Sequence, residues 1–524
     1  MTESLWAAAL AFALSLFLPV AAQADEPISA IDWLNLGTDS TDSTNEADAV
    51  SSATEESLNG VPDGDAATSA KSVSPANGST VTAEPASDRM PYRRPELPEG
   101  FLPFVTPASI DRLVTAQPTT DIPAVRSLLR RVLLGQIRFA DVELNAGPVL
   151  AARIDALTRM GDVYRAVRLA ESVEPIPGPA FGAWFGAMLL GGQPEAACER
   201  LAMRRDLDNW PVARVDCLVR ADASNDAMMV LAVGEALGQI TPEDSRLLRA
   251  RLDPGSPTPA AADWATNPLS LALQTDLGLA VGNPDRPAAI LARDLDESPG
   301  AERRLHAAER LFLNGVIPFG QLRQIYVESL QAGLSSERAT ALLSVEKAVE
   351  SDLAQRISTR LRMVFPVFAV SGREPILAEL LSTLPPGRLD GYGPSGQFLR
   401  YLCLFRASPQ VEACLAGGAK ARNPVLAPVW ESEGPDLSTL SEFERAVRDA
   451  WQSDTADPEA PDRDRAVFGR GETVLRALLI LGDGTKANPE AVETALRALR
   501  ETDLESEARQ IAHQMMARWQ WSDR

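Results

Sequence analysis

The residues PVLAARIDALTRMGDVYRAVRLAESV, at positions 148–173, decide the predicted fold. They read as a helix, a Gly-Asp turn and a second helix. In the first helix Leu150, Ile154 and Leu157 recur at the spacing of a single helical face. A helix of three or four turns cannot bury such a stripe by itself, so it must pack against its neighbours. The stretch therefore predicts short helix hairpins stacked side by side.

Helices of the same kind are predicted along most of the remaining chain. They are expected after Pro179 and Pro194, and over 124–134, 223–237, 242–251, 300–314, 318–332, 335–349, 351–370, 375–384, 397–406, 409–416, 438–452, 472–481, 489–500 and 504–519. Alternating polar and apolar residues, which half-buried β-strands require, never run beyond about five positions. The predicted fold class is all-α, an α-solenoid of short antiparallel helix hairpins.

Two of these helices carry N-terminal signals in the sequence. Thr241 is expected to cap the helix that begins at Pro242, with acidic residues in its first turn. Asp121 is expected to cap the helix over 124–134, with Pro123 near its first position. Proline is tolerated there because the N–H that it lacks would have no partner within the helix.

Composition and charge limit the classes of protein to which this chain can belong. The chain has 524 residues, of which 45% are hydrophobic and 6% aromatic, and its formal net charge is −22. The hydrophobic content is enough to form a core, and scarce aromatics suit packing between small-residue helices. A strongly acidic chain repels polyphosphates, so nucleic acid is not expected as a partner.

Residues 1–24 have the pattern of a secretory signal peptide. Leu5 to Val20 is an apolar run, and Ala22-Gln23-Ala24 resembles a small-x-small cleavage site. The first four residues contain no Lys or Arg, so an uncleaved N-terminal anchor is the alternative. Cleavage would leave no membrane span and would place the chain in the periplasm or outside the cell.

Residues 25–95 differ sharply in composition and are expected to form a disordered acidic tether. Between Asp25 and Asp88 there are 13 acidic residues and one base, Lys71. Such a segment buries too little apolar area to offset the entropy lost on ordering. One apolar motif at 28–36 interrupts it and either docks on a partner or packs back onto the helices. Its apolar residues are Ile28, Ile31, Trp33, Leu34 and Leu36.

The folded part is expected to contain two sets of helical repeats. The first covers 96–252 and the second 267–524, with a Pro-rich break at 253–266 between them. The Pro-rich residues 91–104 are expected to run extended along the first helices. Residues 455–465 are expected to form an acidic loop.

The four cysteines are the strongest chemical signal. Cys198 and Cys217 fall on successive predicted helices, and so do Cys403 and Cys414. An even number of cysteines in an exported chain favours disulfides over metal ligation. Of the three pairings that four cysteines allow, the local one is favoured, because short loops close easily. Zinc is not expected, since there is no C-x-x-C motif and the chain has only two histidines.

No group of residues predicts an active site, a cofactor or a metal. The glycine spacing of Gly391–Gly396 resembles a dinucleotide loop, but no βαβ unit surrounds it, so a turn is favoured. Gly482–Lys486 lacks the ending of a phosphate-binding loop and is also expected to be a turn. His306, amid charged residues, fits a general base or a solvated helix face. His513 has no Ser or Cys at nucleophile spacing.

The C-terminal residues form an apolar patch that includes Met515, Met516, Trp519 and Trp521. Covering the end of the repeat array is one role for it, since terminal repeats must shield the core. Trp519 and Trp521 are also candidate partner-binding residues, because Trp and Met are enriched at interfaces.

The residues LTRMGDVYRAVRLA, at 157–170, resemble tetratricopeptide-like helical repeats in a degenerate form. The 34-residue spacing of that family and most of its Trp, Tyr and Pro positions are missing. The whole chain also resembles a group of uncharacterised exported bacterial proteins that share the island SAIDWL at 29–34. The tetratricopeptide resemblance implies peptide or protein binding on a concave surface; the second resemblance supplies no activity.

Three functions follow as hypotheses. The first is a non-enzymatic periplasmic scaffold or adaptor that binds another protein of the cell envelope. The second is a receptor for a peptide or small molecule, with a groove near residues 254–259. The third is a peptidoglycan enzyme or its accessory subunit, because helical repeats accompany lytic transglycosylases whose catalytic motif pairs Glu with Ser. Glu171-Ser172 is the matching pair here, without the rest of that motif.

Overall fold

The computed structural model describes residues 103–522 except 105–106, 118–119, 136–137, 140–145, 208–209, 254, 256–266, 280–285, 297–299, 351–353, 370–371, 382–404, 406–439 and 453–460. The predicted signal, the tether and the 28–36 motif lie outside these residues. So do Cys403, Cys414, the Gly391–Gly396 turn and, except for Phe405, the helices predicted over 397–416.

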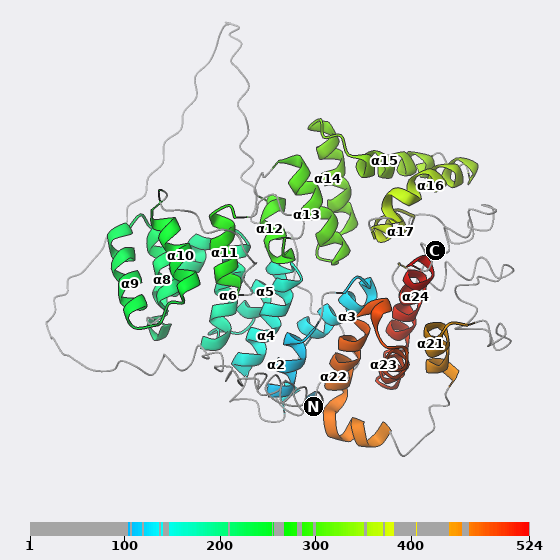
Figure 1. Cartoon of the computed structure of the whole chain (residues 1–524), viewed down its shortest axis with the longest axis horizontal. Helices are drawn as coiled ribbons and strands as arrows, with labels where there is room; N and C mark the ends of the chain where they lie inside the picture. The colour runs from blue at the N-terminus through cyan, green and yellow to red at the C-terminus, as the bar shows by residue number, and fades with distance from the viewer. Residues whose placement is uncertain are drawn as a thin grey trace, which may run out of the picture. The chain divides into compact units, whose positions relative to one another are not determined.

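The described part of the chain is all-helical apart from one minimal strand pair, as the sequence predicts (Figure 1). The helices of the first half are α2 (Pro107–Thr115), α3 (Pro123–Leu134), α4 (Ala146–Arg159), α5 (Val163–Glu171), α6 (Gly178–Leu190), α7 (Pro194–Met203), α8 (Pro211–Arg220), α9 (Ser224–Ala236), α10 (Pro242–Leu252), α11 (Pro268–Asp276) and α12 (Ala288–Asp296). Those of the second half are α13 (Ala301–Leu313), α14 (Phe319–Gln331), α15 (Glu337–Glu350), α16 (Ala354–Ala369), α17 (Glu374–Leu380), α21 (Glu442–Gln452), α22 (Pro461–Leu481), α23 (Pro489–Glu501) and α24 (Glu505–Ser522). The 3₁₀ turns η2 and η6 cover Arg205–Leu207 and Gly484–Lys486.

Most predicted helix boundaries agree with these within two or three residues. Thr241 caps α10 as expected, because its side chain accepts a hydrogen bond from the Asp244 amide. The predicted strap at 91–104 ends in strand β1 (Pro103–Phe104), which pairs in parallel with β2 (Arg138–Phe139). The predicted loop over 455–465 is wrong at its end, since α22 already begins at Pro461 and continues through a kink at Gly469.

The prediction for Asp121 is also wrong. The residue before α3 is Ile122, which is buried and offers no capping side chain, while Pro123 occupies the first helical position. The amide of Ala124 instead donates to Oε1 of the buried Gln514, 2.7 Å away. A side chain from the last helix thus satisfies an N–H that a local cap normally serves.

Consecutive helices pack on one another through much of the described chain. Pairs in contact include α4 with α5, α5 with α6, α8 with α9, α12 with α13 and α15 with α16. The C-terminal helices also meet the first ones, because α22 packs on α2 and α24 packs on α3. An ion pair of 2.6 Å between Arg131 and Glu507 joins α3 to α24.

Helix α6 lies at the centre of the first group of helices. Its sequence, GPAFGAWFGAMLL, is apolar on every side, as expected of a helix that is buried all round. It packs against α4, α5, α7, α11 and α12. The rings of Phe181 and Trp184 are both buried, 5.0 Å apart. Gly186 permits the close crossing of α11, because a Cβ there would lie 2.5 Å from Pro268 Cβ.

Candidate functional site

Helix α9 exposes a broad apolar face. The exposed fractions of Met228, Met229, Val233 and Leu237, the last at its C-cap, are 51%, 62%, 52% and 65%. Ala232 and Ala236 are exposed between these larger residues. At 100° per residue the six positions cover one side of the helix. Their spacing makes a continuous stripe rather than the scattered apolar residues that any protein surface carries.

The opposite side of α9 is the one that packs on the protein. It carries the buried residues Ala227, Leu231 and Gly234, and it meets α8 and α10, which lie beside α9 in Figure 1. Gly234 brings the helix close to its neighbours, because a Cβ there would lie 2.6 Å from Ile240 and 3.2 Å from Pro211. Helix α9 is therefore apolar on both sides, like α6, but the described residues cover only one of its sides.

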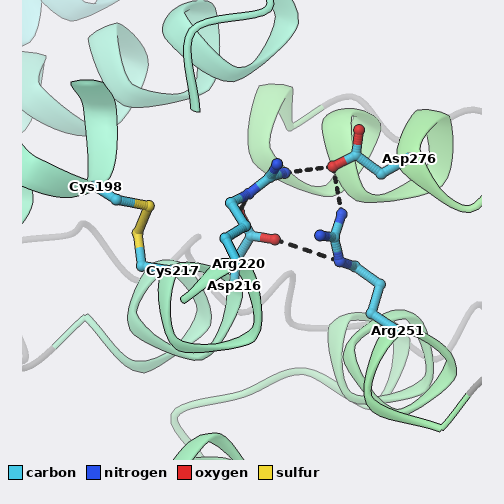
Figure 2. Close-up of a disulfide and its surroundings, with 6 residues drawn as sticks. All are labelled: Cys198, Asp216, Cys217, Arg220, Arg251 and Asp276. Atoms are coloured by element: carbon cyan, nitrogen blue, oxygen red, sulfur yellow. Dashed lines mark hydrogen bonds and ion pairs between the residues drawn. A yellow bond between two sulfur atoms is a disulfide. The ribbon is translucent and has the colours of Figure 1, made fainter. Parts of the chain in front are cut away.

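A disulfide joins α8, on which α9 packs, to α7. Figure 2 shows the bond between Cys198 of α7 and Cys217 of α8. Their Cα atoms are 5.5 Å apart. The local pairing expected for these two cysteines is confirmed. Both residues are only partly buried. A structural disulfide is typical of proteins that fold in an oxidising compartment outside the cytosol.

Replacing Cys198 and Cys217 together by serine is expected to destabilise the protein by about 2–4 kcal/mol, because the unfolded chain regains the freedom that the cross-link removes. Urea unfolding of the purified chain, with and without a thiol reductant, measures this loss. The wild type in reductant should match the double serine variant. A variant as stable as the oxidised wild type would contradict the expectation.

Partly buried ion pairs join α8 to α10 and α11, as Figure 2 shows, and a further pair joins α11 to α12. Asp276 of α11 contacts Arg220 of α8, Arg251 of α10 and Arg293 of α12. Asp216, which is fully buried, pairs with Arg220 at 2.9 Å and with Arg251 at 3.6 Å. One carboxylate shared by three guanidinium groups ties four helices together.

The two carboxylates of this network differ in their protonation equilibria. Burial raises the pKa of Asp216, and the neighbouring Arg220 offsets that effect only in part. Burial acts in the same sense on Asp276, but the cations Arg220, Arg293 and Arg251 outweigh it and lower its pKa. Asp276 is therefore charged at neutral pH, which suits a structural role in holding the arginines.

A second buried hub lies among α13, α14, α15 and α17. The carboxylate of Glu309, fully buried, accepts hydrogen bonds of 2.7 Å from the Tyr326 hydroxyl and from Nε of Arg338 and Arg373. Burial, together with the charge of Glu309, raises the pKa of Tyr326. The hydroxyl therefore stays protonated and continues to donate. All three partners come from different helices or helix ends, so this hub also joins elements.

The other residues singled out in the sequence are placed separately from one another. His306 is half-buried on α13, and His513 is buried on α24. Ser172 donates to the Leu169 carbonyl, and Glu171 pairs with Arg200 at 3.4 Å, so both bond within the helical framework. The segment predicted as a turn at 482–486 contains the short 3₁₀ turn η6.

The C-terminal candidates lie at the end of α24. Met515 and Met516 are fully buried. The ring of Trp519 stacks on the buried Phe443 of α21, with 4.8 Å between centroids. The side chain of Trp521 and most of the predicted groove near 254–259 lie outside the described residues.

Sequence reasoning did not identify the α9 face, although a signal for it is present. The segment DAMMVLAVGEAL, at 226–237, has apolar residues on every side of a helix, the pattern of α6. That pattern predicts burial on all sides. The intramolecular contacts of the described chain leave one side of α9 uncovered, so the pattern points to an additional contact.

Among the described residues, no three His, Cys, Asp or Glu side chains group as metal ligands. None of the described helices combines the length and apolar character needed to cross a membrane. Comparisons of the chain with protein-family models, with curated proteins and with solved structures give no match.

Proposed function

We propose that this protein is a non-enzymatic scaffold of the periplasm, built as a tetratricopeptide-like α-solenoid, that binds another protein of the cell envelope. The observation that carries the proposal is the exposed apolar face of α9, centred on Met229 and Val233. Exposing this apolar area to water is unfavourable, and a partner that covers it removes that free-energy cost. Protein interfaces commonly have such an apolar centre.

The framework around α9 suits this role. The disulfide at Cys198 and the ion pairs of Asp276 hold α7, α8, α10, α11 and α12 against one another. A rigid framework loses little conformational entropy when its partner binds, so more of the contact energy appears as affinity.

Two features support the proposed compartment. The signal-like residues 1–24 would deliver the chain across the inner membrane, and the Cys198–Cys217 disulfide persists where the redox environment is oxidising.

Site-specific crosslinking in intact cells tests the function. A photoreactive amino acid placed at position 229 is expected to give one discrete covalent adduct with another protein, identified by mass spectrometry. The matched control carries the same group at position 302, which is exposed on α13. Equal adducts at both positions, or none at position 229, would contradict a partner on α9.

A further inference from the structure

We infer that the partner element on the α9 face is a cationic amphipathic helix; this rests on the proposed function and specifies its partner. The exposed stripe runs from Met228 to Leu237, which at 1.5 Å per residue is about 15 Å. That length and the single-sided arrangement match two to three turns of a second helix laid along α9.

The surface shape of the stripe also fits a helix. Ala232 and Ala236 are one turn apart along its middle, so the surface is low there. Met228, Met229 and Leu237 stand higher around them and are 51–65% exposed. Side chains of an approaching helix fill such a low centre, while the unbranched Met side chains adapt to the shape of what they meet.

The charged residues near the stripe indicate the charge of the partner helix. Asp222 and Asp226 are exposed at the N-terminal end of the stripe, and α9 contains no Lys or Arg. Its other acid, Glu235, is already held by Arg249 of α10 at 2.5 Å. Beyond the Glu235–Arg249 pair, the charge carried by α9 and by Asp222 just before it is therefore negative. The whole chain carries −22. A partner with basic residues flanking its apolar face complements both features.

The same charge disfavours two other occupants. A second copy of the chain would bring Asp222 and Asp226 near an equally acidic molecule whose own net charge is −22. An anionic lipid surface attracts helices that carry Lys and Arg on their polar side, which α9 lacks.

Binding of defined peptides to the full chain tests the inference. The probe is a fluorescent 18-residue helix of Leu and Lys in an amphipathic pattern, with a scrambled peptide of the same composition and a Leu/Glu amphipathic peptide as comparisons. Fluorescence anisotropy is expected to show saturable one-to-one binding of the amphipathic Leu/Lys peptide. The scrambled and the acidic peptides should bind at least tenfold more weakly.

The variant Met229→Glu separates apolar docking from simple charge attraction. It adds a negative charge, so binding by charge alone would become tighter, whereas docking on the stripe should weaken at least tenfold. The control is Met363→Glu on α16, which places the same change at a methionine that is 63% exposed. It should leave the affinity within about twofold of wild type. Circular dichroism melting verifies that both variants fold.

The outcomes distinguish the inference from the function on which it rests. Tighter or unchanged binding by Met229→Glu, or equal binding of the scrambled peptide, overturns the cationic helix. If either result is obtained but position 229 still gives a discrete crosslink in cells, the scaffold function is supported with another class of partner. Sedimentation that shows a wild-type dimer and a monomeric Met229→Glu variant assigns the face to a second copy and also overturns the inference.

Discussion

Glu309→Gln is expected to destabilise the folded chain by about 3–5 kcal/mol, because it removes a buried charge that two guanidinium groups require. Glu309 is fully buried and is bonded by Tyr326, Arg338 and Arg373. Glutamine has nearly the same shape, yet it provides no negative charge and only one carbonyl oxygen to accept hydrogen bonds. The urea midpoint, at an unchanged m-value, gives the loss directly.

The matched control is Glu302→Gln on the same helix. Glu302 is exposed, so its change in unfolding free energy should stay within about 0.5 kcal/mol. If both variants unfolded at the wild-type urea concentration, the hub around Glu309 would not contribute to stability.

Lowering the pH is expected to reduce the free energy of unfolding, because His513 takes up a proton more readily in the unfolded chain. Burial, and to a smaller extent the nearby Arg509, lowers the pKa of this imidazole from 6.5 to about 3 in the folded state. In the unfolded chain the same group takes up a proton as the pH falls below 6.5. Since the unfolded state then binds more protons, the stabilising contribution is complete above pH 6.5 and is lost as the pH falls toward 3. Between pH 7.5 and 4.5 the loss from this group is roughly 3 kcal/mol.

The variant His513→Gln separates this effect from the titration of carboxylates. Glutamine is neutral throughout, so the unfolding free energy of the variant should fall less than that of the wild type over the same pH interval. The quantity to compare is the difference between pH 7.5 and pH 4.5 in urea unfolding. Identical differences for the two proteins would show that His513 takes up its proton equally readily in both states.

The helical fold was predictable because periodicity is a local property. Leu150, Ile154 and Leu157 are spaced for one face of α4, and all three are buried. Likewise the cap at Thr241 depends on atoms three residues apart, so the sequence alone predicted it. The Cys198–Cys217 bond was favoured for a similar reason, because a short loop joins the two residues.

What the sequence did not predict depends on distant partners. The cap of α3 comes from Gln514, 390 residues away, and no local rule relates it to Ala124. The carboxylates of Asp276 and Glu309 acquire their roles only when other helices bring arginines to them. Acidic residues are common in this chain, so their spacing alone could not identify these two.

The stripe on α9 illustrates a different limit. Its residues indicated burial on every side, and Ala227 and Leu231 are indeed buried, but Met229 and Val233 are exposed. Periodicity reports how much apolar surface a helix carries, without stating whether the same chain covers it.

The bond between Ala124 and Gln514 has a consequence for biosynthesis. The residues of α3 emerge from the ribosome long before those of α24, so the apolar surface of α3 stays incompletely covered until α24 has been made. A nascent chain can therefore complete the packing of α3 only after α24 has been synthesised, however early the residues of α3 leave the ribosome.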